Sequence, residues 1–342
     1  MEDHKQKGKI MQRFATASRV FRSTIYCTFL IAAPVHAEDG KGTLSISLDN
    51  DLFGAGSDSH YTHGTEITYV SNTYQPPYIE DMAKATGIHS DGDDLRFGIS
   101  LGQLMFTPDD ISRTDPILDD RPYAGWLYLS GGMYSESRRG GIRSIDKLEL
   151  IIGVVGPESR ADQMQKAVHE VTDSEEPMGW ENQLDNEATI DVAYQHEWVL
   201  PIVDNHVDII PMVAATLGTS QRYAATGFTM RFGRGLDADS GPPLIRPTAS
   251  ASQYFKPRQN FYWYVFAGAH GRYVGHNIFL DGNRNGDSLS VDKKEWVGEG
   301  QAGLVLGWSN WRVALTEIYR TREFEGQDAA DEYGSIAISY RL

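Results

Sequence analysis

The sequence predicts an all-β protein, a transmembrane antiparallel β-barrel of about 12 strands with a helix in an outer loop at its mouth. Three observations predict this fold. The chain ends in a strand, Ser335–Leu342, whose large apolar side chains all fall on one face. Its N-terminal region is typical of an export signal, and stretches of alternating polar and apolar residues lie between the two. A final strand with an uncovered apolar face is typical of the closing strand of an outer-membrane barrel, where lipid covers that face.

Residues 1–37 are predicted to be a cleavable signal peptide, which leaves residues 38–342 as an outer-membrane barrel domain. Six basic residues precede an apolar run from Ile25 to Ala33, and Val35-His36-Ala37 supplies a small-residue cleavage site. A membrane-spanning helix is the alternative, but it needs about 20 apolar residues and the run is shorter. The expected location is therefore the bacterial outer membrane.

Composition limits the possible partners. Cys27 is the only cysteine and lies in the segment expected to be removed, so the mature chain can form no disulfide. The long basic stretch leaves open whether translation begins at Met1 or Met11.

Without residues 1–37, which hold six of 31 basic and two of 47 acidic residues, the net charge falls from −16 to −20. This acidity argues against a nucleic-acid partner. Lipopolysaccharides are also anionic, so an acidic protein among them is expected only if divalent cations bridge the like charges.

Alternation with a period of two predicts twelve strands, an even number. A mean hydropathy of −0.40 excludes a helical membrane bundle but not a barrel, whose strands expose apolar residues only at alternate positions. A soluble β-sandwich shares this alternation, and the signal and the C-terminus favour the barrel. The expected strands are 43–49, 66–74, 95–104, 124–134, 145–155, 188–199, 207–217, 222–232, 261–273, 296–308, 311–321 and 333–342.

The connections between the expected strands differ in length. Trp311 follows Trp308 almost at once, and aromatic residues of this kind near strand ends are typical of interfacial girdles. Barrels usually combine short periplasmic turns with long outer loops, so we expect the long connections outside the cell. No domain boundary or repeat is visible, and a monomer is expected. The long, polar connections are 75–94, 105–123, 156–187 and 233–260.

One long loop contains a predicted helix. From Ser159 to Thr172 there is no Gly or Pro, and the stretch follows a Pro-Glu-Ser start. We expect an amphipathic helix over the barrel mouth. Gln165 and His169 are four residues apart and therefore share a face of that helix. Its apolar residues recur at helical spacing at Ala161, Met164, Val168 and Val171.

Polar residues cluster where the first expected strand ends. Asp49, Asn50 and Asp51 bring hard oxygen donors close together, as calcium requires. An Asx-turn that ends the strand is the alternative explanation, and this segment alone favours it. The segment Tyr61-Thr62-His63-Gly64, which opens the second strand, leaves the same two explanations open.

These segments resemble the motifs of the outer-membrane lipid A 3′-O-deacylase family. The matches run in chain order and cover roughly the first half of the mature chain, and an ordered set is far more specific than one short motif. The second half matches only as a barrel pattern. The matching motifs are Asn50-Asp51, Tyr61-Thr62-His63-Gly64, Arg121-Pro122-Tyr123-Ala124-Gly125-Trp126, Gly153-Val154-Val155-Gly156-Pro157, Gln165 with His169, and Gly179-Trp180 before Gln183.

The resemblance implies a twelve-stranded barrel with its active site between the wall and the helix of an outer loop. The implied activity removes the ester-linked acyl chain at the 3′ position of lipid A in lipopolysaccharide, with Ca²⁺ as cofactor. Transferred residue by residue, the resemblance makes His169 the histidine base and Gln165 its neighbour one helical turn earlier. It makes Asn50, Asp51 and Thr62 the site residues on the strands.

Three further positions are compared with the family pattern. Glu175 falls where the family has an acidic calcium-site residue, which makes Asp51 and Glu175 the expected metal ligands. His63 stands where relatives often carry a small or amide residue. Arg113 aligns with a lysine, and an arginine keeps the charge but not the compact ammonium geometry. Arg113 could stabilise an oxyanion or bind a phosphate.

The implied mechanism is a hypothesis that needs no serine nucleophile. Neutral His169 removes a proton from water as the water attacks the ester carbonyl, and Ca²⁺ held by Asp51 and Glu175 stabilises the oxyanion. Asn50 and Thr62 orient ligands or donate hydrogen bonds to the oxyanion. An exposed helix histidine without a role is the alternative for His169.

Two other motifs have structural explanations. Gly98-Ile99-Ser100-Leu101-Gly102 has the pattern of a serine-hydrolase elbow, which requires a sharp strand-to-helix turn. Because it lies inside an alternating strand, Ser100 is expected to face the lumen. The segment from Asp281 to Asp287 imitates the start of an EF-hand loop, but position twelve is Asp292 and no helices are expected beside it. A solvated turn is the expectation there.

Two rival functions remain. An outer-membrane phospholipase is also a calcium-using barrel, and phospholipid cleavage that depends on Ser100 would favour it. A porin or adhesion barrel is no enzyme, and membrane conductance with unchanged lipid A would favour it.

Overall fold

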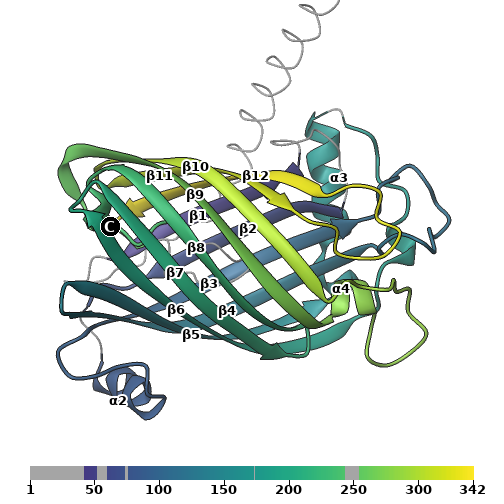
Figure 1. The fold of residues 1–342 in the computed structure, drawn as a ribbon. Coiled ribbons are helices and arrows are strands. Elements are labelled where there is room, and N and C mark those ends of the chain that lie inside the picture. The colour runs from purple at the N-terminus through teal and green to yellow at the C-terminus, as the bar shows by residue number, and fades with distance from the viewer. Residues whose placement is uncertain (1–41, 52–59, 74–75, 173, 243–253) are drawn as a thin grey trace, which may run out of the picture.

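The computed structural model describes residues 42–51, 60–73, 76–172, 174–242 and 254–342. They form a closed barrel of twelve antiparallel strands in which each strand pairs with its neighbours in sequence and β12 pairs with β1 (Figure 1). The expected signal peptide lies outside these residues. The strands are β1 (Thr43–Asn50), β2 (His60–Val70), β3 (Asp94–Thr107), β4 (Ala124–Arg139), β5 (Ile142–Val155), β6 (Glu187–Val203), β7 (Val207–Gly218), β8 (Gln221–Arg234), β9 (Arg258–Asn277), β10 (Trp296–Ser309), β11 (Trp311–Arg320) and β12 (Asp331–Arg341).

The predicted twelve-strand barrel is thus confirmed, and strand alternation explains how it meets lipid. On β3, Ile99 and Leu101 are about half exposed on the outer face, whereas Ser100 between them is buried. Ser100 shares a hydrogen bond of 3.0 Å with Thr68 inside the barrel. Since β3 continues through this residue without a turn to a helix, Ser100 faces the lumen as expected and is not a nucleophile elbow.

The last strand closes the barrel as its pattern predicts. Ile338 and Tyr340 point outward, and Ser339 between them is fully buried. Ser45 of β1 donates a hydrogen bond of 2.8 Å to Ser339 across the seam. Closure leaves no strand edge exposed to lipid, where an unpaired backbone group would cost several kcal/mol.

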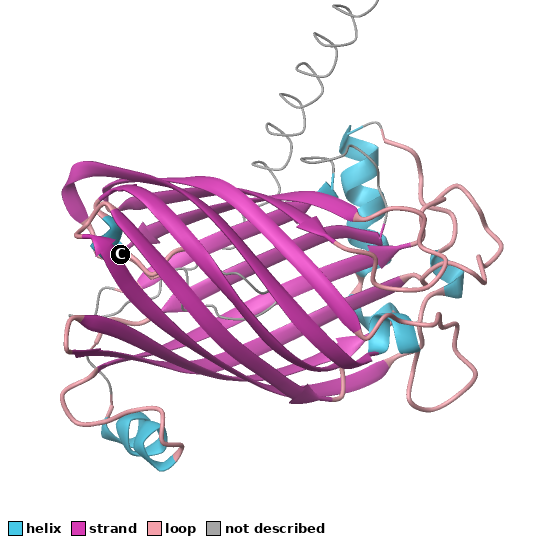
Figure 2. Ribbon diagram, in the orientation of Figure 1, coloured by secondary structure: helices cyan, strands magenta, loops and turns pink. Residues whose placement is uncertain are grey.

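The expected placement of the long connections is wrong for two of the four. Successive connections of an antiparallel barrel leave opposite ends, so the β2–β3 and β8–β9 connections lie at the end where β1 begins and β12 ends. We call this the terminal end, and we call the opposite one the α3 end after the helix α3 (Ala161–Thr172) that lies there. Figure 2 shows helical segments at both ends. No helix in the described part of the chain is long and apolar enough to cross a membrane.

The helical segments divide between the two ends. At the terminal end lie α2 (Pro77–Ala85) and the short η4 (Leu236–Ala238). At the α3 end lie η2 (Pro157–Ser159), α3 (Ala161–Thr172), η3 (Trp180–Asn182) and α4 (Ile278–Asp281).

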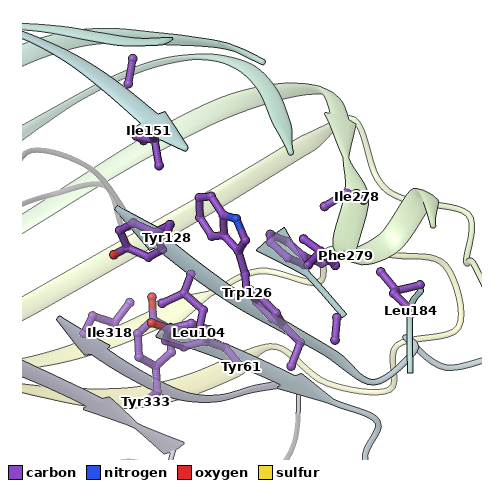
Figure 3. Packing of buried hydrophobic residues seen from close by; sticks show 14 residues of the cluster. Tyr61, Leu104, Trp126, Tyr128, Ile151, Leu184, Ile278, Phe279, Ile318 and Tyr333 are labelled. Carbon is purple, nitrogen blue, oxygen red and sulfur yellow. The ribbon is translucent and has the colours of Figure 1, made fainter. Parts of the chain in front are cut away.

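An aromatic cluster fills the lumen toward the α3 end (Figure 3). Phe279 of α4 stacks on Phe106 of β3 with ring centroids 4.4 Å apart, and Trp126 lies 5.8 Å from Phe279. The Trp126 indole donates to Thr189 at 2.9 Å, so its polar atom is satisfied inside the barrel. The α3 end of the lumen is therefore packed with side chains.

A buried ionic cluster stabilises the terminal end of the lumen. Asp239, which follows η4, has a fully buried side chain that accepts from Arg312 at 2.6 Å and from Arg231 at 3.0 Å. Tyr264 donates a third hydrogen bond to it at 2.8 Å. Buried charges are tolerated only when they are paired and hydrogen-bonded in this way. Asp239 therefore ties η4 to β8, β9 and β11.

Replacing Asp239 with Ala is expected to lower the free energy of unfolding by about 3–5 kcal/mol, because two buried guanidinium groups lose their shared partner. Urea unfolding in lipid vesicles measures the change. The control is Asp237→Ala, which removes the half-exposed partner of Arg258 in the same segment and should cost about 1 kcal/mol or less. Equal losses for the two variants would contradict the assigned role of Asp239.

Candidate functional site

Strand-borne polar residues meet at the rim of the α3 end. Asn50, the last residue of β1, donates from its side-chain amide to the Thr62 carbonyl at 3.0 Å. Thr62 lies where the β2–β3 register shifts between Tyr61 and His63. Its hydroxyl shares a hydrogen bond of 2.7 Å with that of Thr107, the last residue of β3. The expected site residues Asn50 and Thr62 are thus joined to each other and to a third strand.

Alternation places these groups on the outer face of the wall. Asn50 has the same parity as the half-buried Leu44, Ile46 and Leu48, while the residues between them are buried toward the lumen. Thr107 has the same parity as the exposed Ile99 and Leu101 of β3. The Asn50 amide and the Thr107 hydroxyl therefore face the lipid side of the barrel near its rim.

Helix α3 lies against this same outer face, on β3 and β4. Gln103 of β3 donates to the Ser159 carbonyl at 2.6 Å, just before the helix begins. Met105 of β3 packs with Ala161, the first helical residue. A Cβ atom on Gly125 of β4 would lie 2.2 Å from the Ser159 hydroxyl and 2.3 Å from the Ala161 Cβ. The contact therefore requires glycine at position 125.

The predicted helix is confirmed, and Gln165 and His169 share a face as expected, but only part of the expected apolar stripe lies on the buried face. Ala161, Gln165 and His169 are buried at spacings of four residues, whereas Met164 is 46% exposed. Two polar side chains thus point into the contact with the barrel, and an apolar one points away. The Val171 side chain lies outside the described residues.

Gln165 is held by an aromatic pair. The Trp180 indole donates to the Gln165 side-chain oxygen at 2.7 Å. Trp180 packs on Tyr123 with ring centroids 5.0 Å apart, and Tyr123 donates to the Ile111 carbonyl. With its oxygen engaged, Gln165 keeps a buried amide nitrogen that makes no hydrogen bond to any residue of the described segments. This nitrogen is a donor one helical turn from His169.

The ring of His169 has a fixed orientation. Its Nδ1 atom is hydrogen-bonded to the backbone carbonyl of Glu175. A carbonyl oxygen only accepts, so Nδ1 donates, and the neutral ring carries its lone pair on Nε2. A histidine oriented by a second group in this way has the arrangement of a general base.

The two halves of the site share one surface. Neighbouring strands are about 4.8 Å apart, so β1 and β3 are separated by about 10 Å. Asn50 and Thr62 occupy the first part of this strip, and α3 rests on its continuation over β3 and β4. Hard oxygen donors and an oriented imidazole thus lie on one outer face of the wall at one rim.

The expected metal ligands have different environments. The Asp51 side chain is buried directly after β1, whereas Glu175 is exposed and contacts His169 through its carbonyl. Within the described ranges, no three His, Cys, Asp or Glu side chains form a metal cluster. The donor set nevertheless suits calcium, because carboxylate, amide, hydroxyl and carbonyl oxygens gather at this rim.

Among the described residues, no hydrogen bond or ion pair links Arg113 to the His169 imidazole. It is exposed on the β3–β4 connection, next to Gly179, whose Cβ would lie 3.1 Å from the Arg113 carbonyl. Arg113 therefore flanks the loop that presents Trp180, and its guanidinium remains at the surface.

His63 pairs with Asn50 in the β-ladder, and its ring is 2.6 Å from the Thr65 hydroxyl. The EF-hand-like segment follows directly on α4, which ends at Asp281, so the expectation that no helix lies beside it is wrong. Its polar side chains are engaged within the protein: Asp281 pairs with His276 at 2.9 Å and Lys293 at 3.0 Å, and Asn283 donates to the Asp185 carbonyl. Although burial opposes it, the hydrogen bonds from His276 and Lys293 hold the pKa of Asp281 below its ordinary value.

Two supporting residues escaped prediction from the sequence. Trp180 stood in a matching motif without a role, and its bond to Gln165 depends on how two loop segments fold together. Thr107 gave no signal at all, since only the β2–β3 pairing brings it to Thr62.

Comparison with known proteins gives a family. The family model described as outer membrane protein LpxR matches residues 24–342. The solved structure of LpxR from Salmonella typhimurium has a TM-score of 0.70 and 21% sequence identity, and the match covers 88% of this chain and 100% of that one. The β domain of the Bordetella autotransporter BrkA has a TM-score of 0.47 and 10% identity, covering 89% and 100%. No curated protein matches.

The family model spans the whole barrel, from before β1 to the last residue of the chain. The Salmonella structure has the same fold. The chain therefore belongs to the LpxR family of outer membrane proteins.

Proposed function

We propose that this protein is a lipid A 3′-O-deacylase, a calcium-dependent ester hydrolase of the outer leaflet. The observation that supports the proposal best is that the oriented His169 and the oxygen donors of Asn50 and Thr62 belong to the same outer face of the wall at one rim. A porin would place its functional groups in the lumen. A site on the lipid side suits a substrate that remains in the membrane while it reacts.

The substrate class follows from this location. The α3 end is taken as the extracellular end, where lipopolysaccharide forms the outer leaflet. The acyl chains of lipid A would lie along the apolar outer wall, with the ester bonds near the rim that carries Asn50, Thr62 and His169. The resemblance to the deacylase family supplies the 3′ position.

The reaction begins with proton transfer to His169. The Nε2 atom takes a proton from water as the water oxygen bonds to the ester carbonyl carbon. The tetrahedral species then expels the sugar oxygen, which takes the proton back from Nε2. The products are a free carboxylic acid and a sugar hydroxyl.

Neighbouring side chains would stabilise the charge that develops. The amide nitrogen of Gln165 can donate to the carbonyl oxygen as it becomes negative. Asn50 and Thr62 orient oxygen ligands at the rim. Ca²⁺ held by Asp51 and Glu175 would supply positive charge near the same oxygen.

Replacing His169 with Ala should lower the rate of lipid A deacylation by about 10²–10⁴-fold, the usual contribution of a general base. Mass spectrometry of lipid A from expressing cells measures the loss of the acyl chain. Heat-dependent gel mobility confirms that the barrel is folded.

The matched control for this experiment is Ser100→Ala, which changes a lumen-facing residue of the wall and should keep full activity. Undiminished deacylation by the His169 variant would contradict the assignment. Phospholipid cleavage that depends on Ser100 would favour a phospholipase instead. Unchanged lipid A in cells expressing the native protein, together with conductance in planar bilayers, would favour a porin.

Chelation of calcium should abolish deacylation in reconstituted membranes, and added Ca²⁺ should restore it. Mg²⁺ should not, because it demands a tighter octahedral shell. Asp51→Asn should raise the Ca²⁺ concentration needed for half-maximal activity, whereas Asp49→Asn should not, since Asp49 accepts from Tyr61 inside the barrel. Full activity in chelator would refute the metal requirement.

Replacing Trp180 with Phe removes the donor that orients Gln165 and should lower kcat about tenfold, equivalent to about 1.4 kcal/mol. KM should change little if Gln165 acts mainly in the transition state. Trp198→Phe, at the terminal end, is the control. A Trp180 variant with native kcat would show that the hydrogen bond to Gln165 has no role in the reaction.

A further inference from the structure

Helix α2 packs on the outside of the barrel at the terminal end. Ala83 is fully buried and forms an apolar cluster with Ile88 and Leu95, beside the partly buried Met133 of β4 and Leu148 of β5. Met133 and Leu148 point outward, because they have the same parity as the exposed outer-face residues of their strands. The helix therefore covers part of the surface that otherwise faces lipid. In Figure 1, α2 lies beside the wall at this end.

Two adjacent faces of α2 are apolar. Ile79 and Ala83 are four residues apart and contact the wall. Tyr78 and Met82, also four apart, are 63% and 53% exposed. The polar face carries Glu80 and Lys84, which form an ion pair of 2.7 Å. Among the residues that the structure describes, none covers Tyr78 or Met82, and large apolar groups exposed on an external helix favour contact with another partner.

The helix lies at the edge of the apolar belt. On β5, outward residues change from Leu148 to Asp146, whose carboxylate is 2.6 Å from the Tyr194 hydroxyl and 2.7 Å from His196. On β4, Met133 is followed on the same face by Ser135, which pairs with Asp146. The belt therefore ends beneath α2, at the depth where a membrane meets water.

The aromatic girdle of the terminal end has a gap at the same place. Every other strand except β1 and β7 carries an outward aromatic residue there, and some touch, as Trp311 and Tyr340 do at 4.6 Å, so β4 and β5 are the one neighbouring pair of the described strands without any. On β4 the aromatic residues are buried, and β5 has none. Since α2 packs on these two strands, Tyr78 takes the place of the missing wall aromatics. The outward aromatics of the terminal end include Tyr69, Phe97, Trp198, Phe232, Phe261, Trp263, Trp308, Trp311 and Tyr340.

We propose that α2 is an interfacial anchor that inserts Tyr78 and Met82 into the phospholipid layer at the terminal end. The surface is continuous with the lipid-facing belt, and a short amphipathic helix binds an interface through its buried apolar area. Acidic groups outnumber basic ones around it, with Glu80, Asp81 and Asp91 near the single Lys84. The helix therefore binds zwitterionic lipid by insertion and does not require anionic headgroups.

Site-specific fluorescence tests this anchor in the full chain with Cys27 replaced by Ser. A bimane label at Met82→Cys, in phosphatidylcholine vesicles, should be quenched by lipid-attached nitroxide and shielded from aqueous iodide. Its iodide quenching constant should be several-fold lower than that of a label at Lys84→Cys, on the polar face of the same helix. A label at Leu150→Cys on the exposed outer wall provides the lipid reference.

A second label at Tyr78→Cys should repeat the Met82 result, and adding anionic lipid or salt should change neither position. Equal iodide quenching at positions 82 and 84 would overturn the proposal. Insertion that appears only with anionic lipid would contradict the proposal that α2 binds zwitterionic lipid. The test does not depend on the proposed enzyme activity, because it reads only the depth of α2.

Discussion

The contact between α3 and the outer face of β3 and β4 determines the rest of the candidate site. It is close because Gly125 has no side chain, which lets Ser159 and Ala161 reach the wall. A helix seated this way buries Gln165 and His169 against the barrel instead of over its lumen. The candidate site therefore lies on the lipid side because the backbone at Gly125 lets the start of α3 come this close to the wall.

Polar groups buried at a lipid-facing surface must be satisfied, since each unpaired group costs several kcal/mol there. Trp180 meets this need for the Gln165 oxygen and the Glu175 carbonyl meets it for the His169 Nδ1 atom, while the Gln165 amide nitrogen makes no hydrogen bond to the described residues. The hydrogen bonds that satisfy buried polar atoms of Gln165 and His169 thus also orient these two side chains. The lumen is packed by aromatic residues at one end and by the Asp239 cluster at the other, and it forms a firm support for this outer surface.

Much of the fold could be predicted because strand alternation is a local property. All twelve strands were expected, most of them within four residues of their bounds, although β2 begins six residues earlier and β4 ends five residues later than expected; the helix after Pro157 was expected too. The ends to which the long connections belong were not, although chain order fixes them. The exposure of Met164 was also missed, because helical spacing shows which residues share a face but not which face packs against other parts of the protein. Asn50, Thr62 and His169 were found only through ordered motifs, while Thr107 depends on strand pairing that no local pattern reveals.

The most direct measurement of the central claim is a double-mutant cycle between His169 and Asn50, read as lipid A deacylation by the reconstituted protein. The two residues lie far apart in the chain and belong to one catalytic unit in this account. The double variant His169→Ala with Asn50→Ala should then be scarcely slower than His169→Ala alone. Losses that multiply, as they do for independent sites, would contradict it.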